Sequence, residues 1–304
     1  MNPRTRGALE MTAAMTISGT VGWLVIETGQ TAPTVVFWRC VFGAVAMLVA
    51  CALRGQLRPG MLSARQLGIV LLGGVALVLN WTLLFAAYPL ASISVATVTY
   101  HTQPFMLTAL GVLLFGERLT GDKAGWLLIA FAGMVLIVTG GQTAGGTGSN
   151  YLAGIGMALG AAFFYAIAAA IAKQLKTVSP YLIVLVQMLV GSVLLAPFAG
   201  LVTLPADSGT WALLVTIGVV HTGLMSTLLY AAIQKIPTSL VGALSFIYPV
   251  VAILVDRAVF GHRLDLIQWL GTAAILAAAA GMNFGWKLLP GRRFPRDRHR
   301  SPPA

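Results

Sequence analysis

The sequence has little charge: only 9% of its 304 residues are Asp, Glu, Lys or Arg, whereas 58% are hydrophobic. A soluble domain carries about 25% charged residues. Together with a mean hydropathy of +0.88, this scarcity excludes a water-soluble globular protein. It predicts an all-α integral membrane protein with several spans.

Other residues and motifs that the sequence lacks argue against several classes of function. Cys40 and Cys51 are the only cysteines, and eleven residues on one helix separate them by about 16 Å, too far for a disulfide. The sequence has no nucleophile elbow, no phosphate-binding loop and no carboxylate pair within an apolar run. These absences argue against an enzyme, a nucleotide-driven pump and a bound cofactor or metal. The net charge is +11. The basic residues that produce it lie between the apolar runs and in the tail, which indicates that they set the membrane topology and do not bind nucleic acid.

Ten apolar stretches are long enough, or nearly so, to cross a hydrocarbon core of ~30 Å. We predict spans at residues 8–27, 33–53, 66–88, 91–115, 124–140, 151–172, 180–200, 210–233, 239–260 and 265–287. The Gly-rich segment 140–148 is the one predicted linker between two halves. The predicted divisions are residues 1–143, residues 144–288 and a basic cytoplasmic tail at 289–304.

The two halves are copies of one unit, because landmarks recur at a constant offset of 145 residues. Pro104 matches Pro249, Phe115 matches Phe260, and the segment 82–87 matches 227–232. Each copy has five predicted spans, and an odd number inverts the second copy relative to the first. We therefore expect two inverted five-helix repeats, with the substrate site near the bilayer midplane between them.

The basic residues predict the orientation. If the amino terminus is inside, 16 of the 19 Lys and Arg residues fall in inside segments. Cytoplasmic segments carry such an excess. Both termini are therefore expected in the cytoplasm.

The repeats resemble a known family. Each copy closes on Pro…Phe-Gly-Glu/His-Arg-Leu, at residues 104–119 and 249–264, with His262 where Glu is expected. This pattern resembles the EamA repeats of the drug/metabolite transporter (DMT) superfamily. Arg39 matches the family's arginine in the second span, and residues 164–166 resemble its aromatic-small motif. Within the family the chain is most similar to bacterial amino-acid exporters of the YddG type. The resemblance implies ten helices, a central cavity and export by alternating access.

A polar face of the fourth span is the first candidate for the substrate site. Tyr100 and His101 precede Pro104, and a proline inside a helix leaves one backbone carbonyl available. Irregular backbone is tolerated in a membrane where it lines a cavity. The second copy repeats this face with Ser245, Tyr248 and Pro249. The alternative is a kink for packing, with His101 bonded to a neighbouring helix.

Asn80 in span three and His221 in span eight are polar groups without a counterpart in the other copy. Such asymmetry suits a ligand with one amino and one carboxylate end, although hydrogen bonding between helices explains it equally well. Ser226 is expected to face elsewhere. The remaining pocket candidates, which core packing also explains, are Thr16, Thr20, Phe163 and Tyr165.

Three charged residues are predicted to gate or anchor the helices. Arg39 lies one or two turns inside span two and is expected to reach the outer interface or pair with Glu27, in preference to binding substrate. Glu117 and Arg118 end span four. They are expected to form an ionic latch with the other half or simply to anchor the helix.

These features predict an inner-membrane transporter. The resemblance to YddG-type exporters implies that it exports small amphipathic metabolites, above all aromatic or neutral amino acids. We expect it to act as a monomer in the lipid bilayer on a small-molecule substrate, without a cofactor, nucleotide or nucleic acid. One alternative is an exporter or facilitator of another metabolite or drug. A membrane enzyme would need a converging acid, base or metal set, and a channel would need an oligomer with a pore-lining ring.

Overall fold

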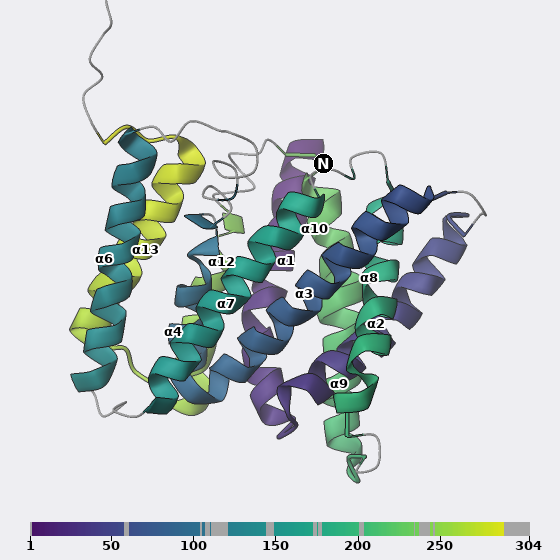
Figure 1. Ribbon diagram of the computed structural model, residues 1–304, viewed down its shortest axis with the longest axis horizontal. Helices are drawn as coiled ribbons and strands as arrows, with labels where there is room; N and C mark the ends of the chain where they lie inside the picture. Colours follow the sequence, from purple (N-terminus) through teal and green to yellow (C-terminus); the bar gives the residue numbers. More distant parts are fainter. Residues whose placement is uncertain are drawn as a thin grey trace, which may run out of the picture.

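The computed structural model describes residues 2–57, 61–103, 105, 106, 110, 121–143, 149–172, 175, 178–200, 204–233, 235, 236, 244, 245 and 247–288. Within these residues every regular element is a helix (Figure 1). The first copy contributes α1 (Pro3–Glu27), α2 (Ala32–Leu53), α3 (Ala64–Ala91), α4 (Ile93–Tyr100) and α6 (Gly121–Thr143). The second contributes α7 (Ser149–Ala172), α8 (Pro180–Leu195), η1 (Ala196–Phe198), α9 (Ser208–Gly218), η2 (Val219–Leu224), α10 (Met225–Ile233), α12 (Ile247–Phe260) and α13 (Leu266–Phe284).

The helices of the described residues include six that are long and apolar enough to cross a membrane: Pro3–Glu27, Ala32–Leu53, Ala64–Ala91, Asn150–Ala168, Tyr181–Phe198 and Ser208–Leu229. Two shorter apolar helices cover Ala124–Ile137 and Leu266–Ala278. All eight coincide with predicted spans. The spans predicted at 91–115 and 239–260 are described only in part, so the count of ten stays a prediction.

The ends of α3 and α13 are fixed by side chains. Ser63 accepts from the backbone N–H of Gln66, whose side chain accepts in return from Ser63. Asp265 and Gln268 form the same reciprocal pair at the start of α13. Such capping boxes satisfy backbone N–H groups that have no partner within the helix. Gly285, with φ of 66°, ends α13 in the left-handed conformation that glycine adopts readily.

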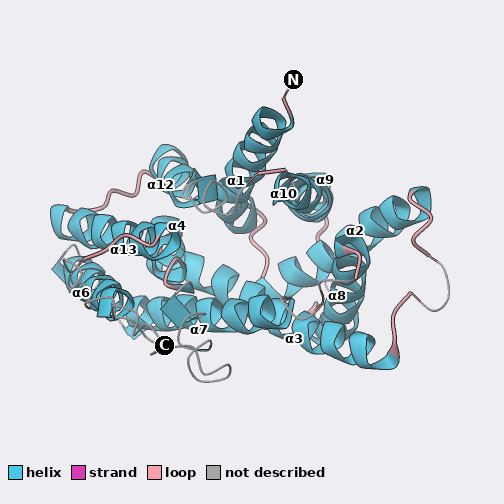
Figure 2. Cartoon of the chain, turned by 90° about the horizontal axis from the view of Figure 1, so that it is seen from above, coloured by secondary structure: helices cyan, strands magenta, loops and turns pink. Residues whose placement is uncertain are grey.

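The packing of the helices follows the duplication. The 145-residue offset carries α1 onto α7 and α3 onto the run α9–η2–α10. Accordingly α3 packs along α7, and α10 packs along α1. The helices α2 and α8, which are equivalent to each other, pack together, as do α6 and α13 (Figures 1 and 2). Exchanging the two copies therefore maps these contacts onto one another.

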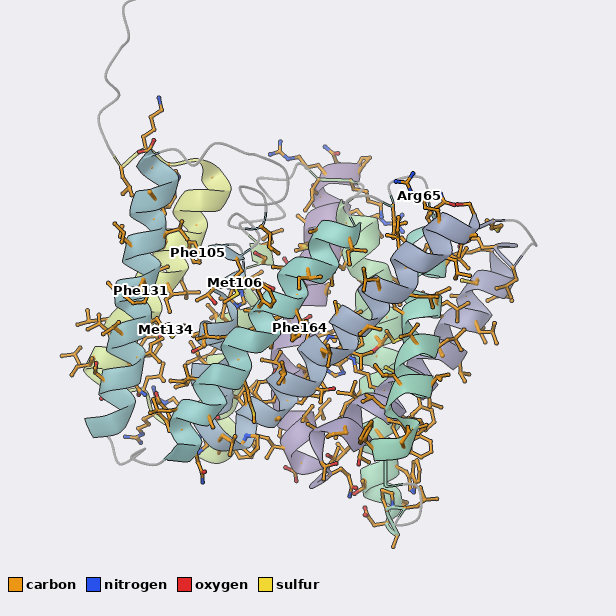
Figure 3. The ribbon with its side chains drawn as sticks, in the orientation of Figure 1. Arg65, Phe105, Met106, Phe131, Met134 and Phe164 are labelled. Carbon is orange, nitrogen blue, oxygen red and sulfur yellow. The ribbon has the colours of Figure 1, made fainter. Side chains whose placement is uncertain are left out.

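Large apolar side chains cover the outside of the bundle. Phe131 on α6 is 69% exposed, while Met134, three residues further on, is buried (Figure 3). Val193 on α8 and Leu266 on α13 are exposed to a similar degree. A soluble monomer rarely exposes so many large apolar side chains, whereas a bilayer would cover them.

Candidate functional site

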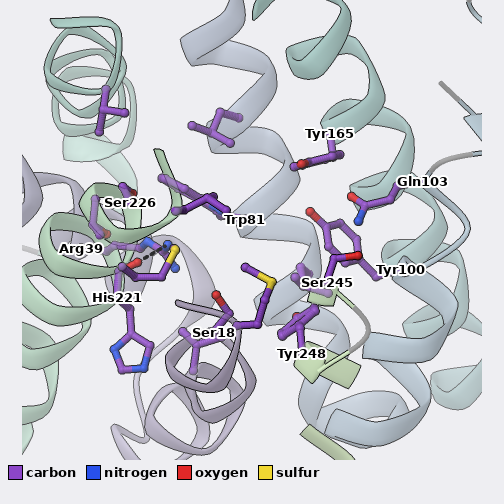
Figure 4. A pocket seen from close by; sticks show the side chains of 18 of the residues that line it. Ser18, Arg39, Trp81, Tyr100, Gln103, Tyr165, His221, Ser226, Ser245 and Tyr248 are labelled. Atoms are coloured by element: carbon purple, nitrogen blue, oxygen red, sulfur yellow. Dashed lines mark hydrogen bonds between the residues drawn. The ribbon is translucent and has the colours of Figure 1, made fainter. Parts of the chain in front are cut away.

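A cavity of about 400 Å³ lies between the two copies (Figure 4). Its walls in the first copy come from α1, α2, α3 and α4 with the turn that follows it; in the second they come from α7, α8, η2, α10, Ser245 and α12. The paired helices α6 and α13 contribute none of its described lining. The substrate-site candidates chosen from the sequence belong to spans one, three, four, six, eight and nine, and the cavity lining adds Arg39 from span two and Gln187 from span seven.

The structure brings together seven of the residues singled out from the sequence: Arg39, Tyr100, His101, Tyr165, His221, Ser245 and Tyr248. Aromatic contacts connect several of them. The rings of Tyr100 and Tyr165 meet edge to face with centroids 5.9 Å apart, and His101 lies 5.3 Å from Tyr248. The Nδ1 atom of His101 is 3.1 Å from the carbonyl of Thr97, one turn earlier. The aromatic wall is thus shared by α4, α7 and α12.

Two predicted residues support side chains of the cavity lining from behind. Asn80 is fully buried, and its amide donates to the Tyr100 hydroxyl at 3.2 Å and to the Ala161 carbonyl at 2.7 Å. It therefore ties α3, α4 and α7 together. The hydroxyl of Thr20 donates to the carbonyl of Ile17 and stands 3.0 Å from Nε2 of His221. Both residues hold a lining side chain without lining the cavity themselves.

Three other predicted residues, which the structure describes, lie away from the cavity. Thr16 is exposed, and its hydroxyl donates to the Thr12 carbonyl of its own helix. Phe163 is 43% exposed and packs against Phe164. Pro249 is buried within α12. Pro104, Glu117 and Arg118 lie outside the described residues.

Arg39 differs from its expected place. It is only 4% exposed and lines the cavity, whereas Glu27 is exposed at the end of α1 and forms no ion pair with it. Arg39 follows Ala32, the first residue of α2, by seven positions, or about 10 Å. At that depth the side chain turns inward between the helices. The expectation that Arg39 reaches the outer interface or pairs with Glu27 is therefore wrong.

Ser226 was expected to face away from His221, yet both line the cavity. In a regular α-helix, residues five apart point about 140° away from each other. Here η2 is a π-helix over Val219–Leu224, and its wider turn brings residues five apart toward one face. Because of this π turn, the expectation that Ser226 faces away from His221 is wrong. Such π turns are frequent at functional sites.

Several lining residues were not selected from the sequence, notably Ser18, Gln103 and Gln187. Gln187 is a buried polar residue in a largely apolar helix. A strongly polar residue within an apolar span can be recognised in the sequence and often faces a cavity. Gln103, next to the predicted kink, offered a similar signal. Ser18 offered none, because small polar residues are common on every face of a membrane helix.

The lining contains one cationic side chain, Arg39, and no carboxylate among its described residues. Nor do three or more His, Cys, Asp or Glu side chains converge on a metal-sized point in the described parts of the chain. The cavity therefore presents hydrogen-bonding, aromatic and cationic groups to a small molecule.

The EamA-like transporter family profile matches residues 5–139 and 152–284. The chain belongs to this family. It is thus a multi-pass membrane transporter of the DMT superfamily, built on a duplicated EamA unit, and the cavity lies between the two matched segments. Transport, and not covalent chemistry, is the activity of this family.

Two relatives are similar over most of their length. An uncharacterized transporter, YxxF, of Bacillus subtilis (strain 168) is 29% identical over 280 residues, covering 91% of this chain and 89% of the relative. An uncharacterized transporter of Archaeoglobus fulgidus is 26% identical over 282 residues, covering 92% and 96%. A crystal structure with 21% identity superposes with a TM-score of 0.63 over 92% of this chain and 97% of that one. It shares the fold.

Proposed function

We propose that this EamA transporter exports small amphipathic amino acids, above all aromatic and neutral ones, across the inner membrane. The observation that carries the proposal is the cavity of about 400 Å³ enclosed by both copies. Pockets for small molecules have volumes of roughly 300–1,000 Å³. The protein acts as a monomer in the bilayer, and no cofactor or nucleotide takes part.

The walls suit an apolar side chain. Trp81, Phe85 and the three tyrosines described above offer aromatic faces and edges, which favour a ring or a branched chain. Four methionines add an adaptable surface: Met11, Met15, Met188 and Met225. Because methionine is flexible and polarizable, it accommodates side chains of several shapes. These walls favour a set of related neutral amino acids over a single one.

Alternating access would move the two copies relative to each other around a fixed site. Two polar contacts between the copies are suited to closing the opposite ends. At the amino-terminal end, Lys235 contacts both carboxylate oxygens of Glu10 at 2.6 Å. At the other end, where α4 begins (Figure 1), Asp256 accepts from the backbone N–H and the hydroxyl of Ser94 at 2.8 and 2.6 Å. In each cycle one contact would open while the other holds.

Purified protein in proteoliposomes tests the proposal. Vesicles loaded with unlabelled L-phenylalanine should accumulate radiolabelled L-phenylalanine, L-leucine and L-tryptophan by counterflow, while L-lysine and L-glutamate stay at the level of protein-free vesicles. Repeating the assay with an imposed pH gradient separates coupled from facilitated transport. If no amino acid exchanges above the protein-free level, the proposed substrate class is wrong.

A further inference from the structure

Arg39 holds an exceptional position in the cavity. Its guanidinium lies 4.0 Å from the centre of the Trp81 ring and 5.6 Å from that of Phe85. One of its terminal nitrogens, Nη2, donates to the His221 carbonyl at 3.3 Å. Its Nε–H, which is buried, has no hydrogen-bond partner. A cation is thus held at the cavity wall with part of its donor set unused.

No carboxylate of the described residues neutralises this charge. Glu10 pairs with Arg6 and Lys235, and Asp256 is bonded to Ser94 and His262. The remaining described acids act elsewhere: Asp207 and Asp265 cap helices, Asp122 accepts from the Leu288 N–H, and Glu27 is exposed. A guanidinium stays charged in proteins, and a buried charge without a counter-ion is strongly unfavourable.

The contacts of Arg39 compensate this cost only in part. Stacking on Trp81 covers one face of the guanidinium plane through a cation–π interaction. That arrangement leaves the edges of the plane, which carry the N–H donors, for other partners. One carbonyl occupies a single donor out of five. The edge of a guanidinium matches the two oxygens of a carboxylate, which it binds with paired hydrogen bonds.

We infer that Arg39 binds the carboxylate of the transported molecule, and that the site selects amphiphiles with an anionic head. This inference rests on the proposed function and names the contact that defines its substrate class. Figure 4 shows Arg39, Trp81, His221 and Ser226 on one side of the cavity, and Tyr100, Tyr165 and Tyr248 on the other. The carboxylate of the transported molecule lies beside Arg39, and its apolar side chain extends toward the three tyrosines.

Four probes with one phenyl ring and different heads test the inference on the purified full-length protein: L-phenylalanine, L-phenylalaninamide, 3-phenylpropionate and phenethylamine. Equilibrium binding and the shift of the thermal unfolding midpoint are measured for each. A ligand that forms hydrogen bonds with a charged group binds about ten- to hundredfold more tightly than the same ligand without them. L-phenylalanine should therefore bind by that factor more tightly than its amide, and 3-phenylpropionate more tightly than phenethylamine.

Variants assign the effect to Arg39. Arg39→Gln should bring the affinity ratio between L-phenylalanine and its amide close to one, and Arg39→Lys, which keeps the charge but not the planar fork, should retain part of it. Arg54→Gln is the matched control, because Arg54 is exposed at the end of the same helix, against Tyr181. A purely structural Arg39 would change the melting midpoint and leave the ratio intact. If Arg39→Gln does not fold, the wild-type probe series decides.

The outcomes separate the inference from the proposed function. Equal binding of the acid and amide probes by the wild type overturns the inference, as does an unchanged ratio in Arg39→Gln. In that case counterflow of L-phenylalanine still supports amino-acid transport. If none of the four probes binds and no amino acid exchanges, the proposed function fails and the inference falls with it.

Discussion

The Arg39 guanidinium donates a hydrogen bond to the backbone carbonyl of His221, 3.3 Å away. This contact joins α2 of the first copy to the π turn of the second, beside the cavity. Close packing holds it in place. A Cβ atom added to Gly218 would lie 2.4 Å from the Phe42 Cβ, and one on Gly43 would lie 2.9 Å from the Thr222 Cγ2. The position of the buried cation thus depends on how closely α2 approaches α9 and η2.

Substituting Gly218 with alanine should disturb this approach. Since the new methyl group overlaps Phe42, the helices must separate, at a cost of about 1–3 kcal/mol. Gly218→Ala should lower the thermal unfolding midpoint and weaken L-phenylalanine binding. Gly156→Ala on α7, where nothing lies within 4 Å of the added atom, should do neither. Equal behaviour of the two variants would contradict this account of the packing.

Asn80 should matter for binding although it lines no cavity. Replacing it with leucine, of similar size, removes the hydrogen bonds that Asn80 donates to the Tyr100 hydroxyl and the Ala161 carbonyl, at about 0.5–1.5 kcal/mol each. Asn80→Leu should lower both stability and affinity for L-phenylalanine. Thr139→Val serves as control, because the exposed Thr139 hydroxyl bonds only within α6. Unchanged binding by folded Asn80→Leu would show that Tyr100 needs no such support.

The contact between Ser94 and Asp256 should be measurable as a coupling. Asp256 is fully buried and accepts from both the backbone and the hydroxyl of Ser94. A double-mutant cycle of Ser94→Ala and Asp256→Asn, read by thermal unfolding, should give a coupling of about 0.5–3 kcal/mol. Arg257→Gln, the exposed neighbour, should change stability by less than about 0.5 kcal/mol. Strict additivity would show that the two residues act independently.

The membrane orientation is open to a direct test. Arg65 lies at the end of the bundle that also holds the amino terminus (Figures 1 and 3), and that end should face the cytoplasm. A green fluorescent protein fused at Ala304 should fluoresce, and alkaline phosphatase at the same site should be inactive. Phosphatase inserted at Gln30, between α1 and α2, should be active. The reverse pattern would invert the predicted topology.

The sequence was sufficient to predict the helical fold, because runs of apolar residues bounded by turns leave few alternatives in a membrane. The 145-residue offset indicated the duplication, and the paired contacts of α3 with α7 and α10 with α1 agree with it. A single sequence does not give the winding inside a span. The π turn at Val219–Leu224 depends on tertiary contacts, and it decides that His221 and Ser226 share a face.

The direction in which a side chain points was equally difficult to predict. Phe163 and Tyr165 are two residues apart on α7 and are exposed to similar degrees, 43% and 38%, yet only Tyr165 lines the cavity. Lipid and an aromatic-lined cavity favour the same residue types, so composition alone does not separate them. For Arg39 the cost of a buried charge argued for the interface. The structure compensates part of that cost with Trp81 and the His221 carbonyl, which only the folded chain brings together.

The most direct test of the central claim, a transport site between the two copies, compares two tryptophan variants of α1. Ser18 lines the cavity, whereas Thr16, two residues earlier, is exposed and does not. Counterflow of radiolabelled L-phenylalanine is measured in proteoliposomes that contain equal amounts of folded protein. We expect Ser18→Trp to fill the cavity and abolish exchange, whereas Thr16→Trp should retain most of it. Exchange at the wild-type rate by Ser18→Trp would show that transport does not pass through this cavity.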